Sequence, residues 1–122
     1  MNSRGDYLLD LEIIGYYDSD EYNSDEYFVL KLNGDSMFPL CDGDMVVVKK
    51  QEHFKSGQTC VVLISKDTPI IRDVIKTNKG VMLISKNPNY TPIDYSYDEI
   101  VSLPIQIIGL VVEAKIKGVF KQ

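Results

Sequence analysis

Residues 33–48 read NGDSMFPLCDGDMVVV: a serine lies in a glycine-led turn, Met-Phe-Pro follows it, and a strand begins after Asp-Gly-Asp. A surface loop has no need of this arrangement, whereas a nucleophile held at the mouth of a cleft does. A serine hydroxyl is a poor nucleophile near neutral pH, so it needs a base to take its proton. Ser36 is therefore a candidate nucleophile, and the rest of the sequence has to supply its partners.

Short β-rich segments with turn residues between them make up most of the chain from residue 27 onward. Runs of β-branched residues, or apolar–polar alternation, bounded by Gly, Pro, Asn and Ser are typical of strands. We expect strands over residues 27–33, 44–50, 57–65, 68–76, 80–86 and 105–117. Six such segments at near-regular spacing predict an all-β fold, either a small distorted β-sandwich or a partly closed barrel.

Three local signals refine this prediction. Thr77-Asn78-Lys79-Gly80 indicates a hairpin turn, because Asn and Gly tolerate positive φ. Gly109 indicates a bulge or bend within the longest strand. Residues 97–104 (YDEIVSLP) favour a short helical turn, which Pro104 would end.

The composition is that of a folded soluble domain, with 44% apolar and 25% charged residues among 122. No apolar run approaches the roughly 18 residues that span a bilayer, and the first ten residues do not resemble a signal peptide. Cys41 and Cys60 are too few for a disulfide scaffold, so we expect both to be reduced and the protein to be cytoplasmic. The sequence lacks a zinc motif and a glycine-rich phosphate loop, so we expect no metal and no cofactor.

The charge is distributed unevenly along the chain. Residues 1–44 carry 11 acidic side chains against two basic ones, whereas residues 45–122 carry seven acidic side chains against 11 basic ones. An acidic first third repels a phosphate backbone, so we expect no direct contact of this domain with nucleic acid. Residues 1–26, which include the acidic run YYDSDEYNSDE, are predicted to form a linker ahead of a β domain over residues 27–122.

Four motifs, in order, carry a resemblance to a known family. GDSMFPLCDGDMVVVKK resembles the active-serine segment of the LexA and phage-repressor family of self-cleaving serine peptidases, which includes UmuD-type proteins. SGQTCVVLI, ISKNPNYTPI and IIGLVVEAKIK are similar to later segments of that family, so the resemblance covers residues 28–117. It implies a LexA-like C-terminal domain, which in the family is catalytic and dimeric. Self-cleavage in the SOS response to DNA damage relieves repression there.

The resemblance also implies partners. In the family a helix-turn-helix domain that binds operator DNA usually precedes the β domain, and the repressor is a homodimer. The 122 residues contain no helix-turn-helix motif. We therefore expect either part of a longer regulator or a stand-alone relative, with operator DNA contacted by a domain outside this chain.

The family's mechanism is a serine–lysine dyad. Ser36 matches its nucleophile, and the backbone N–H of Met37 matches an oxyanion donor. Alignment without a gap from LISKNPNY places Arg72 at the position of the lysine. A buried lysine can lose its proton and act as a base, but arginine is effectively never neutral in a protein. The resemblance therefore implies a peptidase-like fold without its general base, a pseudoenzyme.

The alternative is an active self-cleaving peptidase that uses Lys76. Lys76 is an even number of residues from Arg72, so both side chains would point to the same face of an extended strand. Lys76 lies about 13 Å further along, however, so its use as a base requires a bulge or a register shift. In the family the cleaved bond usually joins Ala or Cys to Gly, a few residues after a segment like LEIIG. Here Asp18, Ser19 and Asp20 occupy that cleavage region, and the chain contains no Ala-Gly pair. Charge is costly in an apolar pocket, so this region argues against cleavage.

We interpret the chain as the regulatory domain of a LexA-like or phage-type repressor that is unable to cleave itself. Residues 105–112 (IQIIGLVV) are expected to contribute to the homodimer. Induction is expected to need an antirepressor or a separate protease. A membrane signal peptidase, whose catalytic core is related, is a third interpretation, and the lack of a membrane anchor argues against it.

Overall fold

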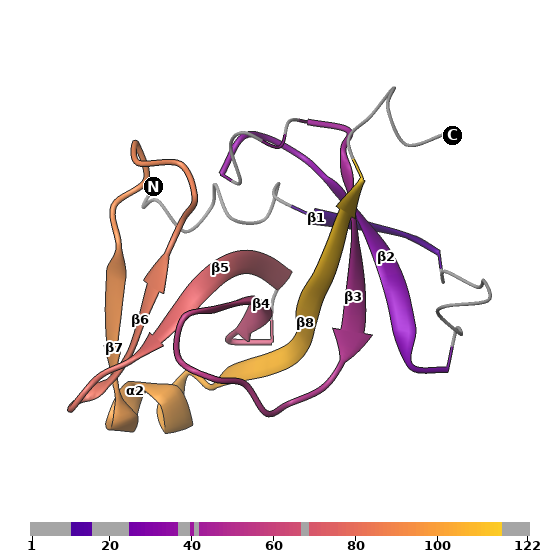
Figure 1. Ribbon diagram of the computed structural model, residues 1–122. Helices are drawn as coiled ribbons and strands as arrows, with labels where there is room; N and C mark the ends of the chain where they lie inside the picture. Colours follow the sequence, from indigo (N-terminus) through magenta and orange to yellow (C-terminus); the bar gives the residue numbers. More distant parts are fainter. Residues whose placement is uncertain (1–10, 16–24, 37–39, 41, 67–68, 116–122) are drawn as a thin grey trace.

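The computed structural model describes residues 11–15, 25–36, 40, 42–66 and 69–115, with side chains from residue 25 to residue 114. These residues form eight strands and one short helix (Figure 1). Within this part of the chain, no helix is long and apolar enough to cross a membrane. The elements are β1 (Leu11–Gly15), β2 (Tyr27–Leu32), β3 (Met45–Lys50), β4 (Gln58–Ile64), β5 (Pro69–Lys76), β6 (Gly80–Ile84), β7 (Ile93–Ser96), α2 (Tyr97–Ser102) and β8 (Ile105–Lys115).

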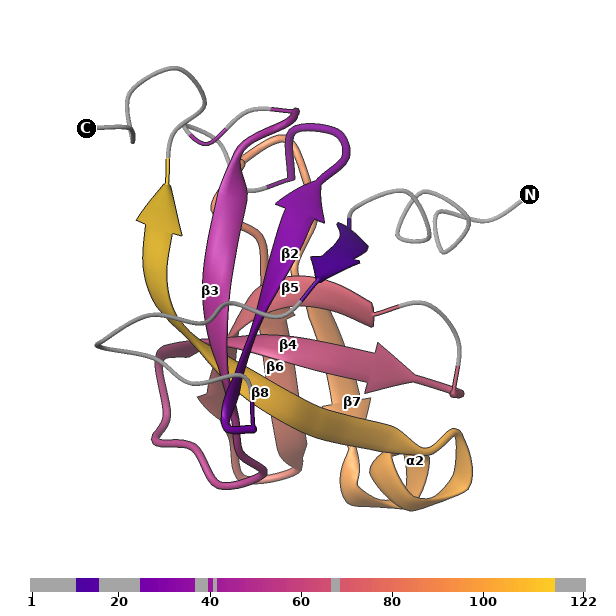
Figure 2. The ribbon, with the colours of Figure 1, turned by 90° about the vertical axis from the view of Figure 1, so that its right-hand side faces the viewer.

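The strands belong to one antiparallel sheet in the order β1-β2-β3-β8-β4-β5-β6-β7. The sheet coils strongly, so that β2 and β3 run across the direction of β4 (Figure 2). The edge strand β1 thereby comes close to β5, while β7 forms the other edge and pairs only with β6, so the sheet stays open. The predicted all-β fold, in its partly closed form, is confirmed.

Two clusters of buried apolar side chains lie on opposite faces of the central strands. The first joins β2 and β3 to Val61 of β4 and Ile71 of β5. The second contains the neighbouring residues Val62 and Ile70 together with residues of β6 and β7. Because successive residues of a strand point to opposite faces, β4 and β5 are buried on both sides and form the rigid centre beside the candidate site.

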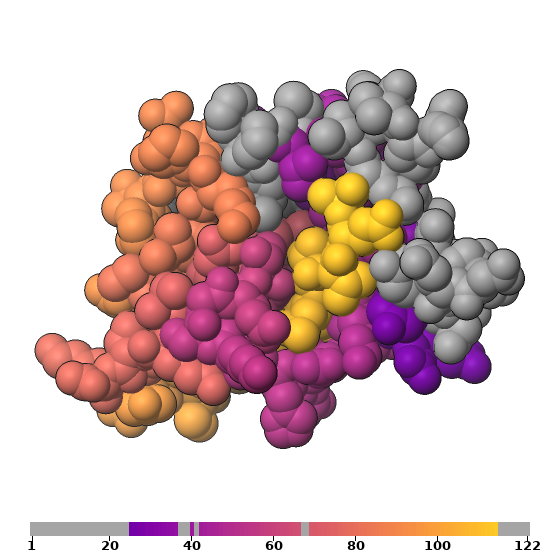
Figure 3. All heavy atoms as spheres, in the orientation of Figure 1, coloured from indigo at the N-terminus to yellow at the C-terminus, as the bar shows by residue number. Residues whose placement is uncertain are grey.

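β8 is the longest strand and lies between β3 and β4. Its pairing with β4 shifts between Val61, opposite Gly109, and Val62, opposite Ile107, which confirms the irregularity predicted at Gly109. A Cβ at Gly109 would overlap Val48 Cγ1, so the close approach of β3 requires glycine there. The C-terminal part of β8, yellow in Figure 3, reaches the molecular surface.

The six predicted strands are confirmed, with ends that differ by at most two residues, and the predicted helical turn is α2. Two strands were not predicted. β1 lies within residues 1–26, which were expected to be a linker, and it pairs with β2. β7 has only four residues between Pro92 and the start of α2. β7 is too short for apolar alternation to stand out, and β1 belongs to a segment whose acidic composition indicated a linker.

The turn between β5 and β6 corrects another expectation. Neither Asn78 nor Gly80 has positive φ; among the described residues, that conformation occurs at Gly34, Gly43, Gly57, Ser65 and Lys66. The turn is held instead by Thr77, whose Oγ1 accepts hydrogen bonds from the backbone N–H groups of Lys79 and Gly80. Gly80 is needed for a different reason, because a Cβ there would overlap the carbonyl oxygen of Tyr95 in β7.

Candidate functional site

The turn that carries Ser36 is tied to the start of β3. The backbone N–H of Leu32 donates to the Asp44 carbonyl at 2.8 Å, and that of Gly43 donates to the Leu32 carbonyl at 2.9 Å. The N–H of Gly34 donates to Asp42 Oδ1 at 3.0 Å. The Asp-Gly-Asp segment thus folds back on the glycine-led turn and fixes it, which accounts for the arrangement that the sequence shows.

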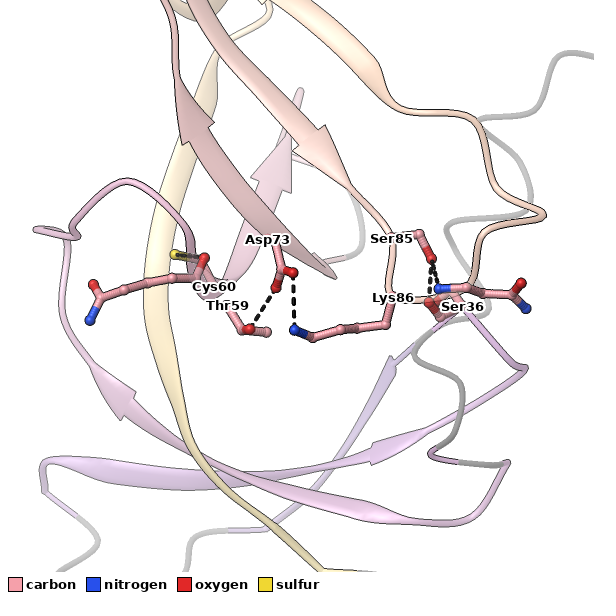
Figure 4. A network of polar contacts seen from close by, with 8 residues as sticks. Ser36, Thr59, Cys60, Asp73, Ser85 and Lys86 are labelled. Atoms are coloured by element: carbon pink, nitrogen blue, oxygen red, sulfur yellow. Dashed lines mark hydrogen bonds and ion pairs between the residues drawn. The ribbon is translucent and has the colours of Figure 1, made fainter.

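A second segment, residues 85–90, holds the serine turn from the other side. The Ser36 carbonyl accepts hydrogen bonds from the Ser85 hydroxyl and from the Asn87 N–H, the latter at 3.2 Å (Figure 4). Asn87 Nδ2 donates to the Asp35 carbonyl at 3.0 Å, and the Tyr90 hydroxyl donates to Asp35 Oδ1 at 2.9 Å. We call these four hydrogen bonds the serine clamp. Ser36 is only 3% exposed within it.

Arg72 lies on β5 beside the serine clamp. Asp73 pairs with Ile84 of β6, the last residue of that strand, so Arg72 precedes one member of this pair and Ser85 follows the other. The Arg72 side chain is 2% exposed, and its Nη1 donates to the Ile71 carbonyl at 2.6 Å. Its guanidinium carbon lies 5.6 Å from the centroid of the Tyr90 ring, within the range of a cation–π interaction. Ser36 and Arg72 therefore share the 85–90 segment as their neighbour.

Lys76 makes its contacts at the other end of β5. It pairs with Val81 next to the hairpin turn, and its N–H donates to Ser56 Oγ at 2.8 Å. The ammonium group lies 4.7 Å from the centroid of the Phe54 ring, a second cation–π contact. These contacts fix Lys76 against the loop between β3 and β4, four residues along the strand from Arg72.

A polar network that sequence reasoning missed lies beside the serine clamp (Figure 4). Asp73 accepts a hydrogen bond from Thr59 Oγ1 at 2.6 Å, and its Oδ2 lies 3.0 Å from Lys86 Nζ. The Lys86 amine is thus directed at Asp73. The motif ISKNPNYTPI contains Ser85, Lys86, Asn87 and Tyr90 in a dense polar pattern, and that pattern was the signal available in the sequence.

Cys60 lies opposite Arg72 in the β4–β5 pairing and is fully buried. Burial, with a smaller contribution from the negative charge of Asp73, raises the pKa of the Cys60 thiol to about 12. The thiol is free and stays protonated at neutral pH, so it is neither a nucleophile nor a base. Cys60 is thus a free thiol that packs in the second buried cluster.

Several predicted site residues lie outside the described residues, namely Met37, Cys41 and the cleavage-region residues Asp18, Ser19 and Asp20. Within the described part of the chain, no group of three or more His, Cys, Asp or Glu side chains is placed to hold a metal ion.

The sequence model of the family described as Peptidase S24-like matches residues 6–112. The chain belongs to this family. It is 35% identical over 83 residues to the LexA repressor of Bifidobacterium adolescentis, covering 66% of this chain and 32% of that protein. It is 31% identical over 93 residues to the LexA repressor of Lacticaseibacillus casei, covering 75% of this chain and 41% of that protein. It is 32% identical over 104 residues to the LexA repressor of Desulfitobacterium hafniense, covering 84% of this chain and 45% of that protein.

The chain therefore spans between a third and a half of the length of these relatives. Membership of the Peptidase S24-like family confirms the resemblance read from the four motifs. The roles of Ser36, Arg72 and Met37 in this chain remain predictions.

Proposed function

We propose that this chain is the dimerisation and regulatory domain of a LexA-like or phage-type transcriptional repressor that has lost self-cleavage. The observation that supports the proposal is the position of Arg72. A buried guanidinium lies beside the serine clamp, at the place where the sequence alignment puts the lysine of a serine–lysine dyad.

The chemistry follows from the side chain at position 72. A serine hydroxyl attacks a carbonyl only when a base removes its proton. Arginine has five N–H donors, no acceptor and a pKa above about 12, so it cannot take that proton. Ser36 keeps its hydroxyl proton, and an oxyanion donor at the Met37 backbone has no developing charge to stabilise.

The alternative, an active peptidase with Lys76 as base, is opposed by the contacts of Lys76. Its amine packs on Phe54 and its backbone is bonded to Ser56. A base has to come within about 3 Å of the hydroxyl, whereas four residues of strand separate Lys76 from Arg72 by about 13 Å. The charged segment Asp18-Ser19-Asp20 also replaces the small apolar residues that the family cleaves.

The proposal includes a homodimer in the cytoplasm, with a helix-turn-helix domain outside this chain that contacts operator DNA. Both edges of β8 are hydrogen-bonded to neighbouring strands, so β8 has no free edge to pair with a strand of a second copy. It would therefore contribute to a dimer through side chains such as Val112, which is 44% exposed. Because the regulator does not cleave itself, an antirepressor or a separate protease relieves repression. An SOS-type or prophage regulator fits this description.

The test is self-cleavage of the purified full-length protein at alkaline pH, followed by intact-mass measurement. We expect the natural chain to stay intact. We expect two fragments only when Arg72→Lys is combined with Tyr17→Ala and Asp18→Gly, which install an Ala-Gly bond. Adding Ser36→Ala to that variant should abolish cleavage. Fragments from the natural chain that disappear in Lys76→Met would contradict the proposal and favour the alternative.

A further inference from the structure

Two Asx-Gly dipeptides, Asn33-Gly34 and Asp42-Gly43, lie face to face in the serine turn. When glycine follows an asparagine, its backbone nitrogen can attack the side-chain carbonyl carbon and close a five-membered succinimide ring. Glycine favours this reaction because it has no Cβ to obstruct the approach and because its backbone is permissive. The structure distinguishes sharply between the two dipeptides.

The Asn33-Gly34 dipeptide is open to ring closure. Gly34 is exposed with φ of +94°, and the space that its Cβ would occupy has no atom within 4 Å. Its N–H donates to Asp42 Oδ1 at 3.0 Å. That carboxylate is exposed and is placed to accept the proton that the attacking nitrogen must lose.

The Asp42-Gly43 dipeptide and the other described asparagines are less favourable. Gly43 is buried, and its N–H is held on the Leu32 carbonyl at 2.9 Å. Asn87 is followed by Pro88, which has no N–H, and its amide is bonded to the Asp35 carbonyl. Asn78 and Asn89 are followed by Lys79 and Tyr90, whose side chains hinder the attack.

We propose that Asn33 is a self-modification site at which the chain deamidates, with Asp42 as the base. The Gly34 nitrogen bonds to Cγ of Asn33 while Asp42 takes its proton, and the Cγ–Nδ2 bond breaks to release ammonia, which carries that proton away. Water then opens the succinimide at either carbonyl. The products are aspartate or isoaspartate at position 33. In the overall reaction, asparagine and water give one of these two carboxylic acids and ammonia.

The modification acts directly on the serine turn. Asn33 lies three residues before Ser36, and either product adds a negative charge close to the carboxylate of Asp42. The isoaspartate product also lengthens the main chain by one carbon atom in a turn that is fixed on both sides. Deamidation therefore weakens the Gly34–Asp42 hydrogen bond and loosens the serine turn, whether or not Ser36 is catalytic. This inference is independent of the proposed function.

The experiment is to incubate the purified protein at mildly alkaline pH and physiological temperature and to follow each asparagine by peptide mapping with mass spectrometry. Isoaspartate is assayed with protein isoaspartyl methyltransferase. We expect Asn33 to convert at least about tenfold faster than Asn78, a barrier difference of about 1.4 kcal/mol. Asp42 should not give isoaspartate. Equal conversion rates at Asn33 and Asn78 would overturn the assignment of Asn33 as the modification site.

Two matched variants test the role of Asp42. Asp42→Ala should slow conversion of Asn33 by about tenfold, a modest effect for a positioned base, while Asp94→Ala, an exposed aspartate on β7, should leave the rate unchanged. Far-UV circular dichroism checks that both variants are folded. A rate in Asp42→Ala equal to or above that of the natural chain would overturn the assignment of Asp42 as base. Asn33→Gln should remove the modified peptide altogether.

Discussion

The Tyr90 hydroxyl donates a hydrogen bond to the Asp35 carboxylate at 2.9 Å, across 55 residues of sequence. The ring of the same tyrosine lies under the guanidinium of Arg72. Tyr90 is thus the side chain that joins Arg72 of β5 to Asp35, the residue preceding Ser36.

Tyr90→Phe removes the hydroxyl and keeps the ring beside Arg72. We expect a loss of about 0.5–1.5 kcal/mol in the free energy of unfolding, as for one hydrogen bond. Faster amide hydrogen exchange should be confined to residues 34–36. Tyr97→Phe is the matched control, since its hydroxyl makes a longer bond of 3.4 Å to Thr77, far from the serine turn. Unchanged exchange at residues 34–36 in Tyr90→Phe would show that the hydroxyl does not hold the turn.

Asn87→Ala should be more destabilising, by about 1–3 kcal/mol, because it leaves buried polar groups without their partner. The Asn87 side chain is 6% exposed; it donates to the Asp35 carbonyl and accepts from the Asn89 N–H. Urea unfolding measures the difference. Asn89→Ala, an exposed neighbour, should change stability by less than about 0.5 kcal/mol. Equal effects of the two substitutions would contradict a structural role of the serine clamp.

The raised pKa of the buried Cys60 thiol predicts that the folded protein loses stability at high pH. Its pKa in the folded state is about 12, against 9.0 for an ordinary thiol. As pH rises, the unfolded state therefore loses the thiol proton first. The protonated Cys60 thiol contributes fully to the free energy of unfolding below pH 9.0, and this contribution is lost between pH 9.0 and about 12. Unfolding free energies of the natural chain and of Cys60→Ala, measured across this range, should converge as pH rises. Parallel profiles would show that the thiol is not desolvated.

The strands were predictable because their signals are local. Valine runs such as residues 46–48 and the turn residues that bound them carry the information within a few positions. β7 was missed because its four residues contain too little alternation, and β1 was missed because it lies in a segment whose acidic composition indicated a linker. At the site, motifs singled out Ser36 and Arg72, whose roles remain predictions, and the structure places both next to residues 85–90. The serine clamp was not predicted, because it joins segments that are 49 to 55 residues apart in sequence. The Asp73–Lys86 pair is closer in sequence, across the β5–β6 hairpin, but it depends on the pairing register of the two strands, which no local pattern specifies.

The position of β8 has a consequence for biosynthesis. Among the described strands, β8 at the centre of the sheet is the last to be made, and β3 and β4 flank it on either side without pairing to each other. A nascent chain that ends before Ile105 therefore presents two open strand edges at once, the kind of surface that invites aggregation. Such long-range pairing also slows folding. The strand pairing that links the two halves of the sheet cannot form until the ribosome has released the residues of β8.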